Sequence, residues 1–198
     1  MHELSSCFVL GYHGCGQAVA EKLLLRHEGF RKSENDYDWL GHGIYFWLEN
    51  PRRACQWAHS HDIEKPAVIG AVINLGRCLD LTTKAGIDSV RTGYLELVRA
   101  LRESDQPIPE NSGDDDMLIR RLDCAVINMT CRIMEEDGCP VDTVKGMFTE
   151  GGPAFDGGAI MEHTHTQVAV RNPACIRGIF LPPAGELEGD DCNAGAQA

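Results

Sequence analysis

The 198-residue sequence lacks any apolar run of about 18 residues, so no membrane-spanning helix and no membrane partner are expected. Its first residues also lack the basic and then apolar pattern of a signal peptide. None of its nine cysteines are spaced as Cys-x-x-Cys, which favours free or buried thiols over a disulfide framework. Together these absences predict a cytoplasmic protein.

Basic residues are scarce, with 18 Lys and Arg against 30 Asp and Glu and a formal net charge of −12. Six of the acids fall in residues 103–116 and four in residues 184–198, two segments that contain no Lys or Arg. The rest of the chain is therefore nearly neutral. This distribution gives no broad basic face for nucleic acid, but it leaves room for a small anionic ligand.

The apolar pattern predicts one α+β domain over residues 1–183, followed by an acidic, disordered tail at 184–198. A helix is expected to begin at Asn50-Pro51, because Asn can cap free amides and Pro loses nothing at the first helical position. Strands are expected at 7–12, 43–47, 66–75, 143–149, 164–170 and 175–181, in one or two mostly antiparallel sheets. Helices are expected at 18–27, 50–59, 86–102 and 116–136, the last two inside a helical insertion at about 85–139.

Two segments near the N-terminus could hold a ligand. His13 lies between glycines after a predicted strand, where backbone and imidazole can both come close to a bound molecule. In residues 41–46, two glycines precede Tyr45, whose ring could form one wall of a slot for a flat heterocycle. The alternative interpretations are a structural or exposed histidine and an aromatic residue of the sheet core.

A third segment, residues 163–167, puts His163, His165 and Gln167 on one face of a predicted strand. Two histidines in this arrangement could bind zinc, but the pattern offers no third protein ligand. No metal site is therefore expected.

In this order, the three segments resemble the motifs of the ADP-ribosyltransferase fold, in the branch of the poly(ADP-ribose) polymerases and diphtheria-toxin-like enzymes. That family takes a His, a Tyr and a Glu from three separate strands. Tyr12-His13-Gly14 resembles its first motif, and residues 41–46 are similar to its second, Gly-x-Gly-Ile-Tyr-Phe. Residues 167–176 look like the third strand of the family and the segment after it. The resemblance implies split antiparallel β-sheets with flanking helices, and NAD as a substrate.

The resemblance implies a role for each matching residue. His13 would bind the adenosine-side ribose of NAD, and the backbone of Gly14 would hold the nicotinamide amide. Gly43 would line the nicotinamide slot, and Tyr45 would stack on the ring. Trp57, on the following helix, would close the slot from the other side.

The sequence departs from the family pattern beside this slot. The second family aromatic stands eleven residues after the tyrosine, where this chain has Gln56, so Trp57 lies one residue late. The family serine that helps to hold the amide is also absent, and Arg53 and Ala54 stand near its position.

The third departure is Gln167, which occupies the position of the family glutamate. Cleavage of the nicotinamide–ribose bond develops positive charge on the ribose, which a carboxamide cannot neutralise. Losing such a group raises the activation free energy of cleavage by on the order of 3 kcal/mol. Elongation of an ADP-ribose chain, for which the family glutamate activates a ribose hydroxyl, is not expected. Glu150 and Glu162, which precede the third motif, could supply the missing carboxylate or could be solvated loop acids.

The resemblance therefore implies an NAD-dependent mono-ADP-ribosyltransferase that modifies a protein or nucleic-acid acceptor. It also suggests a bacterial toxin or antiphage effector, with an antitoxin as a further partner. One alternative, motivated by Gln167, is an NAD- or ADP-ribose-binding module without transferase activity. Others are an NAD glycohydrolase, which uses water as acceptor, and a structural domain in which the motifs occur by chance.

Overall fold

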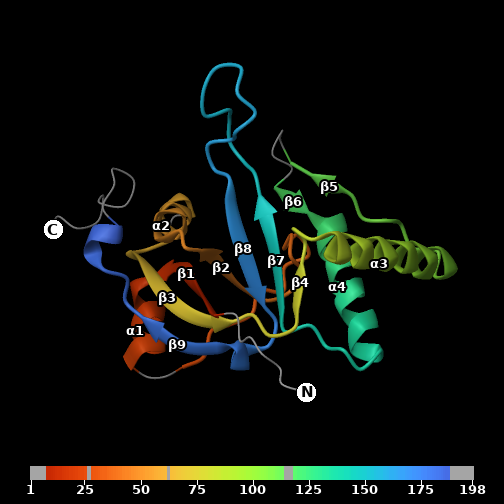
Figure 1. The fold of residues 1–198 in the computed structure, drawn as a ribbon, viewed down its shortest axis with the longest axis horizontal. Coiled ribbons are helices and arrows are strands. Elements are labelled where there is room, and N and C mark those ends of the chain that lie inside the picture. The colour runs from red at the N-terminus through yellow and green to blue at the C-terminus, as the bar shows by residue number, and fades with distance from the viewer. Residues whose placement is uncertain (1–7, 26–27, 62, 114–117, 188–198) are drawn as a thin grey trace.

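The computed structural model describes residues 8–25, 28–61, 63–113 and 118–187, and these residues form a mixed seven-stranded sheet with helices on both faces (Figure 1). The strand order is β4-β7-β8-β2-β1-β3-β9. The pair β4 and β7 is parallel, and the other neighbours are antiparallel. The strands are β1 (Phe8–Gly16), β2 (Ile44–Leu48), β3 (Pro66–Asn74), β4 (Cys78–Asp80), β7 (Thr143–Phe148), β8 (His165–Val170) and β9 (Ile176–Phe180). The predicted α+β class is confirmed.

The two halves of this sheet meet over a short seam between β1 and β2. Within the described strands, β1 and β2 pair at Gly11–Leu48 and Tyr12–Trp47 alone, whereas β1 pairs with β3 from Phe8 to Gly16. Figure 1 shows β7 and β8 running nearly upright, across the direction of β3 and β9. Where split sheets were expected, the strands thus form one hydrogen-bonded sheet whose halves separate beyond the seam.

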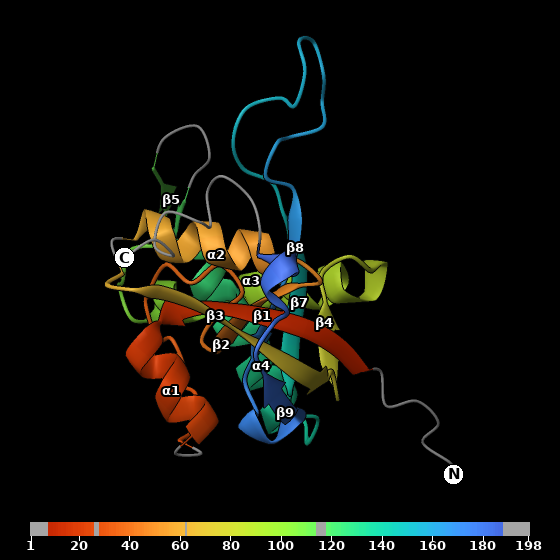
Figure 2. The ribbon, with the colours of Figure 1, turned by 90° about the vertical axis from the view of Figure 1, so that its left-hand side faces the viewer.

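Two helices cover opposite faces of the β1–β3 half, α1 (Gln17–Leu25) and α2 (Pro51–Ser60) (Figure 2). Successive residues of β3 face opposite sides, so Val68 packs against α2 and Ile69 against α1. The start of α2 is as predicted, because the Asn50 side chain accepts a hydrogen bond from the Arg53 amide at 3.0 Å.

The predicted helical insertion forms α3 (Lys84–Glu103) and α4 (Arg121–Glu136), which pack against each other beside the other half of the sheet (Figure 1). Ile127 and Cys131 of α4 pack against Val144 and Ala169 of β7 and β8. Ahead of α4, β5 (Asn111–Ser112) and β6 (Ile119–Arg120) form a small two-stranded sheet. Among the described residues, each helix is too short or too polar to cross a membrane.

The structure differs from the predicted elements at several places, among them β6, which occupies the start of the helix predicted at 116–136, so that α4 begins only at Arg121. The strand β1 continues to Gly16, so His13 lies inside a strand and not after one. The three-residue strand β4 was not predicted at all. In the predicted tail, Ala184–Glu186 forms a short 3-10 helix and the Tyr12 hydroxyl donates to Glu186 at 3.3 Å, so the packed chain extends beyond residue 183. Residues 188–198 and residues 114–116 of the acidic loop lie outside the described residues.

Candidate functional site

A cavity of about 510 Å³ lies between the two halves of the sheet, and every residue assigned to the NAD site from the sequence lines it. The side chains come from both halves, because β1, α2, β2, β8 and the loop after β7 all contribute. The lining residues include His13, Gly14, Gly43, Tyr45, Trp57, Glu150 and Gln167. The fold therefore brings the three motifs together in space.

His13 offers a neutral nitrogen acceptor to this cavity. Its Nδ1 lies 2.9 Å from the backbone oxygen of Tyr45, and because a carbonyl only accepts, Nδ1 carries the proton. Burial lowers the pKa of His13, which keeps the ring neutral and leaves Nε2 as an acceptor. The rings of Phe30 and Phe46 pack around it, with centroids 5.4 and 5.7 Å away. A hydroxyl group is a suitable partner for this nitrogen.

Gly14 lets helix α2 come unusually close to β1. A Cβ atom at this position would lie 2.2 Å from the Ala54 backbone oxygen and 3.2 Å from the Trp57 ring. Glycine is therefore required here for packing, and this requirement alone explains its presence. The same close approach brings Trp57 to the cavity.

The hydroxyl group of Tyr45 is fully occupied by the preceding loop. It accepts a hydrogen bond from the Leu40 amide at 2.9 Å and donates to the Gly41 carbonyl at 2.8 Å. Gly41 has a φ of +72°, which glycine adopts without strain. Burial raises the pKa of Tyr45, so its hydroxyl is not a proton donor or acceptor for chemistry near neutral pH. The ring of Tyr45 remains as a flat surface in the cavity wall.

Trp57 reaches the same cavity from α2, although it stands one residue late. Its ring stacks on His61 with centroids 4.3 Å apart and planes 28° apart, and it packs against Trp47 at 5.7 Å. Together with Tyr45, it gives the cavity aromatic walls from two different elements.

Gln167 is buried in β8, between β2 and β7. The indole N–H of Trp39 donates to its Oε1 at 2.6 Å. Because the oxygen is held in this way, the amide NH₂ is the group of Gln167 that remains for a ligand. This group donates hydrogen bonds and carries no negative charge.

Glu150 places a carboxylate in the cavity, where it forms an ion pair with Arg53. Both side chains are largely buried, and burial lowers the pKa of the Arg53 guanidinium. Arg53 stands near the position of the family serine. In this chain the side chain at that position therefore binds the Glu150 carboxylate and not a ligand amide. Glu162 does not line the cavity and is exposed.

His165 also lines the cavity, whereas its place in the sequence pattern indicated only a metal ligand. Its Nδ1 lies 2.7 Å from the His163 backbone oxygen and therefore carries the proton. Desolvation lowers the pKa of His165 to about 4, so it is neutral and does not share the charge of Glu150, whose Oε1 lies 4.0 Å from Nδ1. His163 lies instead against Gly151 in the preceding loop.

Three buried side-chain nitrogen atoms in the described part of the chain have no hydrogen-bond partner, and all three belong to residues that line this cavity. They are Trp47 Nε1, Arg53 Nε and His165 Nε2. Unpaired polar atoms are rare inside folded proteins and are often found at functional sites. Nothing in the local sequence identifies them, because each depends on the packing around it.

The loop before β2 forms another wall, through Arg31, Ser33, Asn35, Asp38 and Trp39. Asp38 orders this loop by accepting a hydrogen bond from the Asn35 amide at 3.0 Å, and burial raises its pKa. The described residues contain no group of three or more His, Cys, Asp or Glu placed to hold a metal ion. Comparison with protein-family models, curated proteins and solved structures finds no match to this chain.

Proposed function

We propose that this protein is an NAD-dependent mono-ADP-ribosyltransferase acting on a macromolecular acceptor. The observation that carries the proposal is the convergence of the three motifs on one cavity, with aromatic walls from Tyr45 and Trp57. Flat aromatic walls suit a nicotinamide ring, and His13 Nε2 can accept a hydrogen bond from a ribose hydroxyl.

In the proposed reaction, the bond between nicotinamide and ribose breaks and the electron pair leaves with nicotinamide. An acceptor nucleophile then bonds to the ribose carbon and loses its proton to solvent or to Glu150. Glu150 supplies negative charge in place of the family glutamate, although Arg53 offsets part of that charge in this conformation. Gln167 contributes hydrogen bonds alone.

The acceptor is a protein or a nucleic acid in the cytoplasm, in line with a toxin or antiphage role and an antitoxin partner. The test is nicotinamide release from NAD by the purified protein, with and without the protein and nucleic-acid fractions of a cell extract. Release that requires one fraction supports the transferase and identifies the class of acceptor. Release without either fraction assigns an NAD glycohydrolase instead.

Replacing Tyr45 tests the cavity directly. Tyr45→Ala is expected to abolish nicotinamide release while the protein stays folded, because the flat wall is lost. Phe8→Ala removes an exposed aromatic residue outside the cavity and serves as the control. Release retained by Tyr45→Ala contradicts the assignment of this cavity.

A second candidate is an NAD- or ADP-ribose-binding module without catalysis. Two contacts favour it, because Trp39 holds the oxygen of Gln167 and Arg53 neutralises Glu150. Gln167→Glu separates the two functions: a catalytically weak transferase gains NAD cleavage when a second carboxylate is added, whereas a binding module binds NAD without cleaving it.

A further inference from the structure

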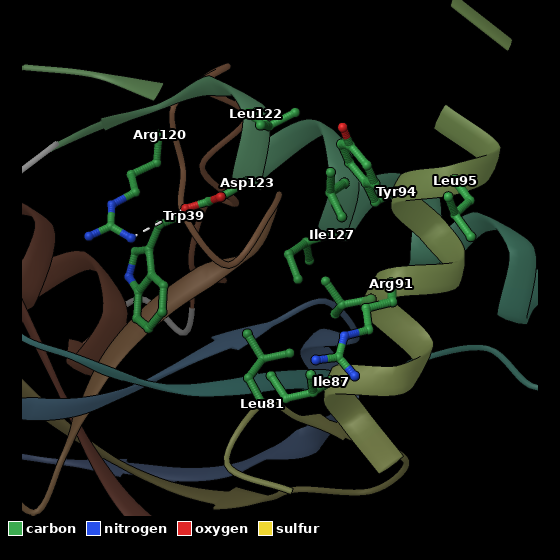
Figure 3. Close-up of a pocket in the computed structure, with 12 residues that line it drawn as sticks. Trp39, Leu81, Ile87, Arg91, Tyr94, Leu95, Arg120, Leu122, Asp123 and Ile127 are labelled. Atoms are coloured by element: carbon green, nitrogen blue, oxygen red, sulfur yellow. Dashed lines mark hydrogen bonds and ion pairs between the residues drawn. The ribbon is translucent and has the colours of Figure 1, made fainter. Parts of the chain in front are cut away.

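A second cavity of about 590 Å³ lies between α3 and α4 (Figure 3), and Trp39 lines both this cavity and the first. Its walls are mostly apolar side chains of the two helices, including Val90 of α3 and Ile127 of α4, with Leu81 after β4. A volume of roughly 300–1,000 Å³ with apolar walls and a few polar groups is typical of small-molecule sites. The size and the walls therefore suit one ring-bearing ligand.

The polar groups of this cavity differ in how tightly they are held. The two oxygens of Asp123 accept from Asn111 at 2.9 Å and from Arg120 at 3.3 Å. The Arg120 guanidinium also lies 4.7 Å from the centroid of the Phe148 ring. These groups form a closed network and are not free to bind a ligand's charge.

Arg91 is different, because its partner is exposed. Figure 3 shows its guanidinium extending from α3 toward Leu81 at the cavity. It pairs with Asp88 at 3.2 Å, and the two side chains are 72% and 47% exposed. Such a surface ion pair contributes about 0–1 kcal/mol, so Arg91 can exchange Asp88 for another anion at little cost. Tyr94, one turn further along α3, also lines the cavity.

We propose that this second cavity binds a small molecule with an apolar ring system and one anionic group. The ring system lies among Val90, Leu81 and Ile127, and the anion binds Arg91. This site is independent of the proposed NAD site, although Trp39 lines both cavities and its N–H holds Gln167.

The test compares two probes with the same rings, 1-anilinonaphthalene-8-sulfonate and its uncharged analogue N-phenyl-1-naphthylamine. Both increase in fluorescence when bound in apolar surroundings, and the assay needs no NAD. The sulfonate probe is expected to bind at one saturable site and more tightly than the uncharged probe. Arg91→Gln is expected to weaken binding of the sulfonate probe about three- to fivefold, the size of one exposed charge pair, and to leave binding of the uncharged probe unchanged.

Val90→Trp fills the cavity and is expected to abolish binding of both probes. The matched controls lie outside the cavity: Val19→Trp is an equal change on the exposed surface of α1, and Arg99→Gln removes another paired arginine of α3. If Val90→Trp loses its cooperative thermal transition, Ile87→Trp, at the exposed rim of the same cavity, replaces it.

Unchanged binding to a folded cavity-filled variant overturns the proposal, since the probes then bind elsewhere. If Arg91→Gln weakens binding of both probes equally, the proposal that Arg91 binds the anionic group is overturned. A wild-type dimer that Val90→Trp converts to a monomer in sedimentation also overturns it, because a second copy of the chain then fills the cavity. None of these outcomes depends on NAD cleavage.

Discussion

The hydroxyl of Tyr45 has two partners in the loop that precedes it, while its ring faces the cavity. Tyr45→Phe leaves the Leu40 amide and the Gly41 carbonyl without this partner but keeps the ring. We expect the free energy of unfolding to fall by about 1–3 kcal/mol. Nicotinamide release, measured on the folded variant, should stay far above that of Tyr45→Ala.

Urea denaturation measures this loss. Tyr94→Phe is the matched control, because Tyr94 is exposed, and it should change the free energy of unfolding by less than about 0.5 kcal/mol. A loss of equal size in both variants would show that the hydroxyl of Tyr45 does not order the loop.

His165 makes the stability of the protein sensitive to acid. Its pKa is about 4 in the folded chain against about 6.5 in an unfolded one, so the unfolded chain binds the proton first. Above pH 6.5 the residue is neutral in both states and has no effect. As the pH falls from about 6.5 to 4, protonation of the unfolded chain removes stability.

Urea denaturation at pH 7, 6 and 5 measures this sensitivity. His165→Gln should reduce the loss of stability across the interval, while part of the loss remains because burial also lowers the pKa of His13. The control His59→Gln changes a histidine outside the cavity. Between pH 7 and pH 5 its free energy of unfolding should fall by as much as that of the wild type. An unchanged pH dependence in His165→Gln would contradict the burial of a neutral imidazole.

At the scale of residues, the local sequence predicts which side chains are candidates but does not predict the contacts that they make with distant segments. The motifs identified His13, Tyr45 and Gln167, but they gave no sign of the bond from Trp39 to Gln167, whose partners are 128 residues apart. The pair of Arg53 and Glu150 spans 97 residues. Such contacts depend on how the strands are ordered in the sheet, which no local pattern records.

At the scale of elements, apolar runs and the Asn50-Pro51 cap were sufficient to predict most strands and the four helices. The strand β4 was missed because it has three residues and is stabilised by parallel pairing with β7, a distant segment. The predicted end of β1 was too early because glycines commonly end a strand. In the structure, Gly14 lies within β1 and allows helix α2 to pack close to that strand.

Gly14→Ala tests this close approach of α2 to β1. The added methyl group would overlap the Ala54 backbone oxygen, so the helix must shift. We expect a loss of about 1–3 kcal/mol in the free energy of unfolding and, on the basis of the proposed function, weaker NAD binding because Trp57 moves with α2. Both are measured by urea denaturation and by NAD titration.

Gly178→Ala in β9 is the matched control, because an added Cβ there meets no atom within 4 Å. It should leave stability unchanged or raise it by up to about 1 kcal/mol. If Gly14→Ala is tolerated as well as Gly178→Ala, the helix is not held at the position described.

At the scale of the whole molecule, the chain between β7 and β8 projects well beyond the body in both views (Figures 1 and 2). Its two arms are joined by backbone hydrogen bonds, such as the Ala154 amide to the Ile160 carbonyl at 2.8 Å. Phe155 and Ile160 are 58% and 64% exposed there. Exposed apolar side chains on a projecting segment that begins at Glu150 favour contact with a macromolecule.

The double variant Phe155→Ser and Ile160→Ser tests this contact, on the basis of the proposed transferase. Thermal unfolding and NAD binding should stay as in the wild type, while labelling of the acceptor falls about tenfold or more. Leu25→Ser with Leu181→Ser removes two exposed leucines elsewhere and should leave labelling intact. Equal labelling by both double variants would exclude the projecting segment from acceptor binding.

In the sheet, β2 lies beside β8, although the two strands are far apart in the sequence. The cavity that they line can therefore form only after β8 has been translated. A nascent chain that ends before residue 165 has made β1, β2 and α2, but it still lacks the strand that carries His165 and Gln167. Non-local pairing of this kind is late and slow in folding. The cavity is therefore incomplete until the ribosome has made β8, which delays the proposed NAD binding until that strand has been synthesised.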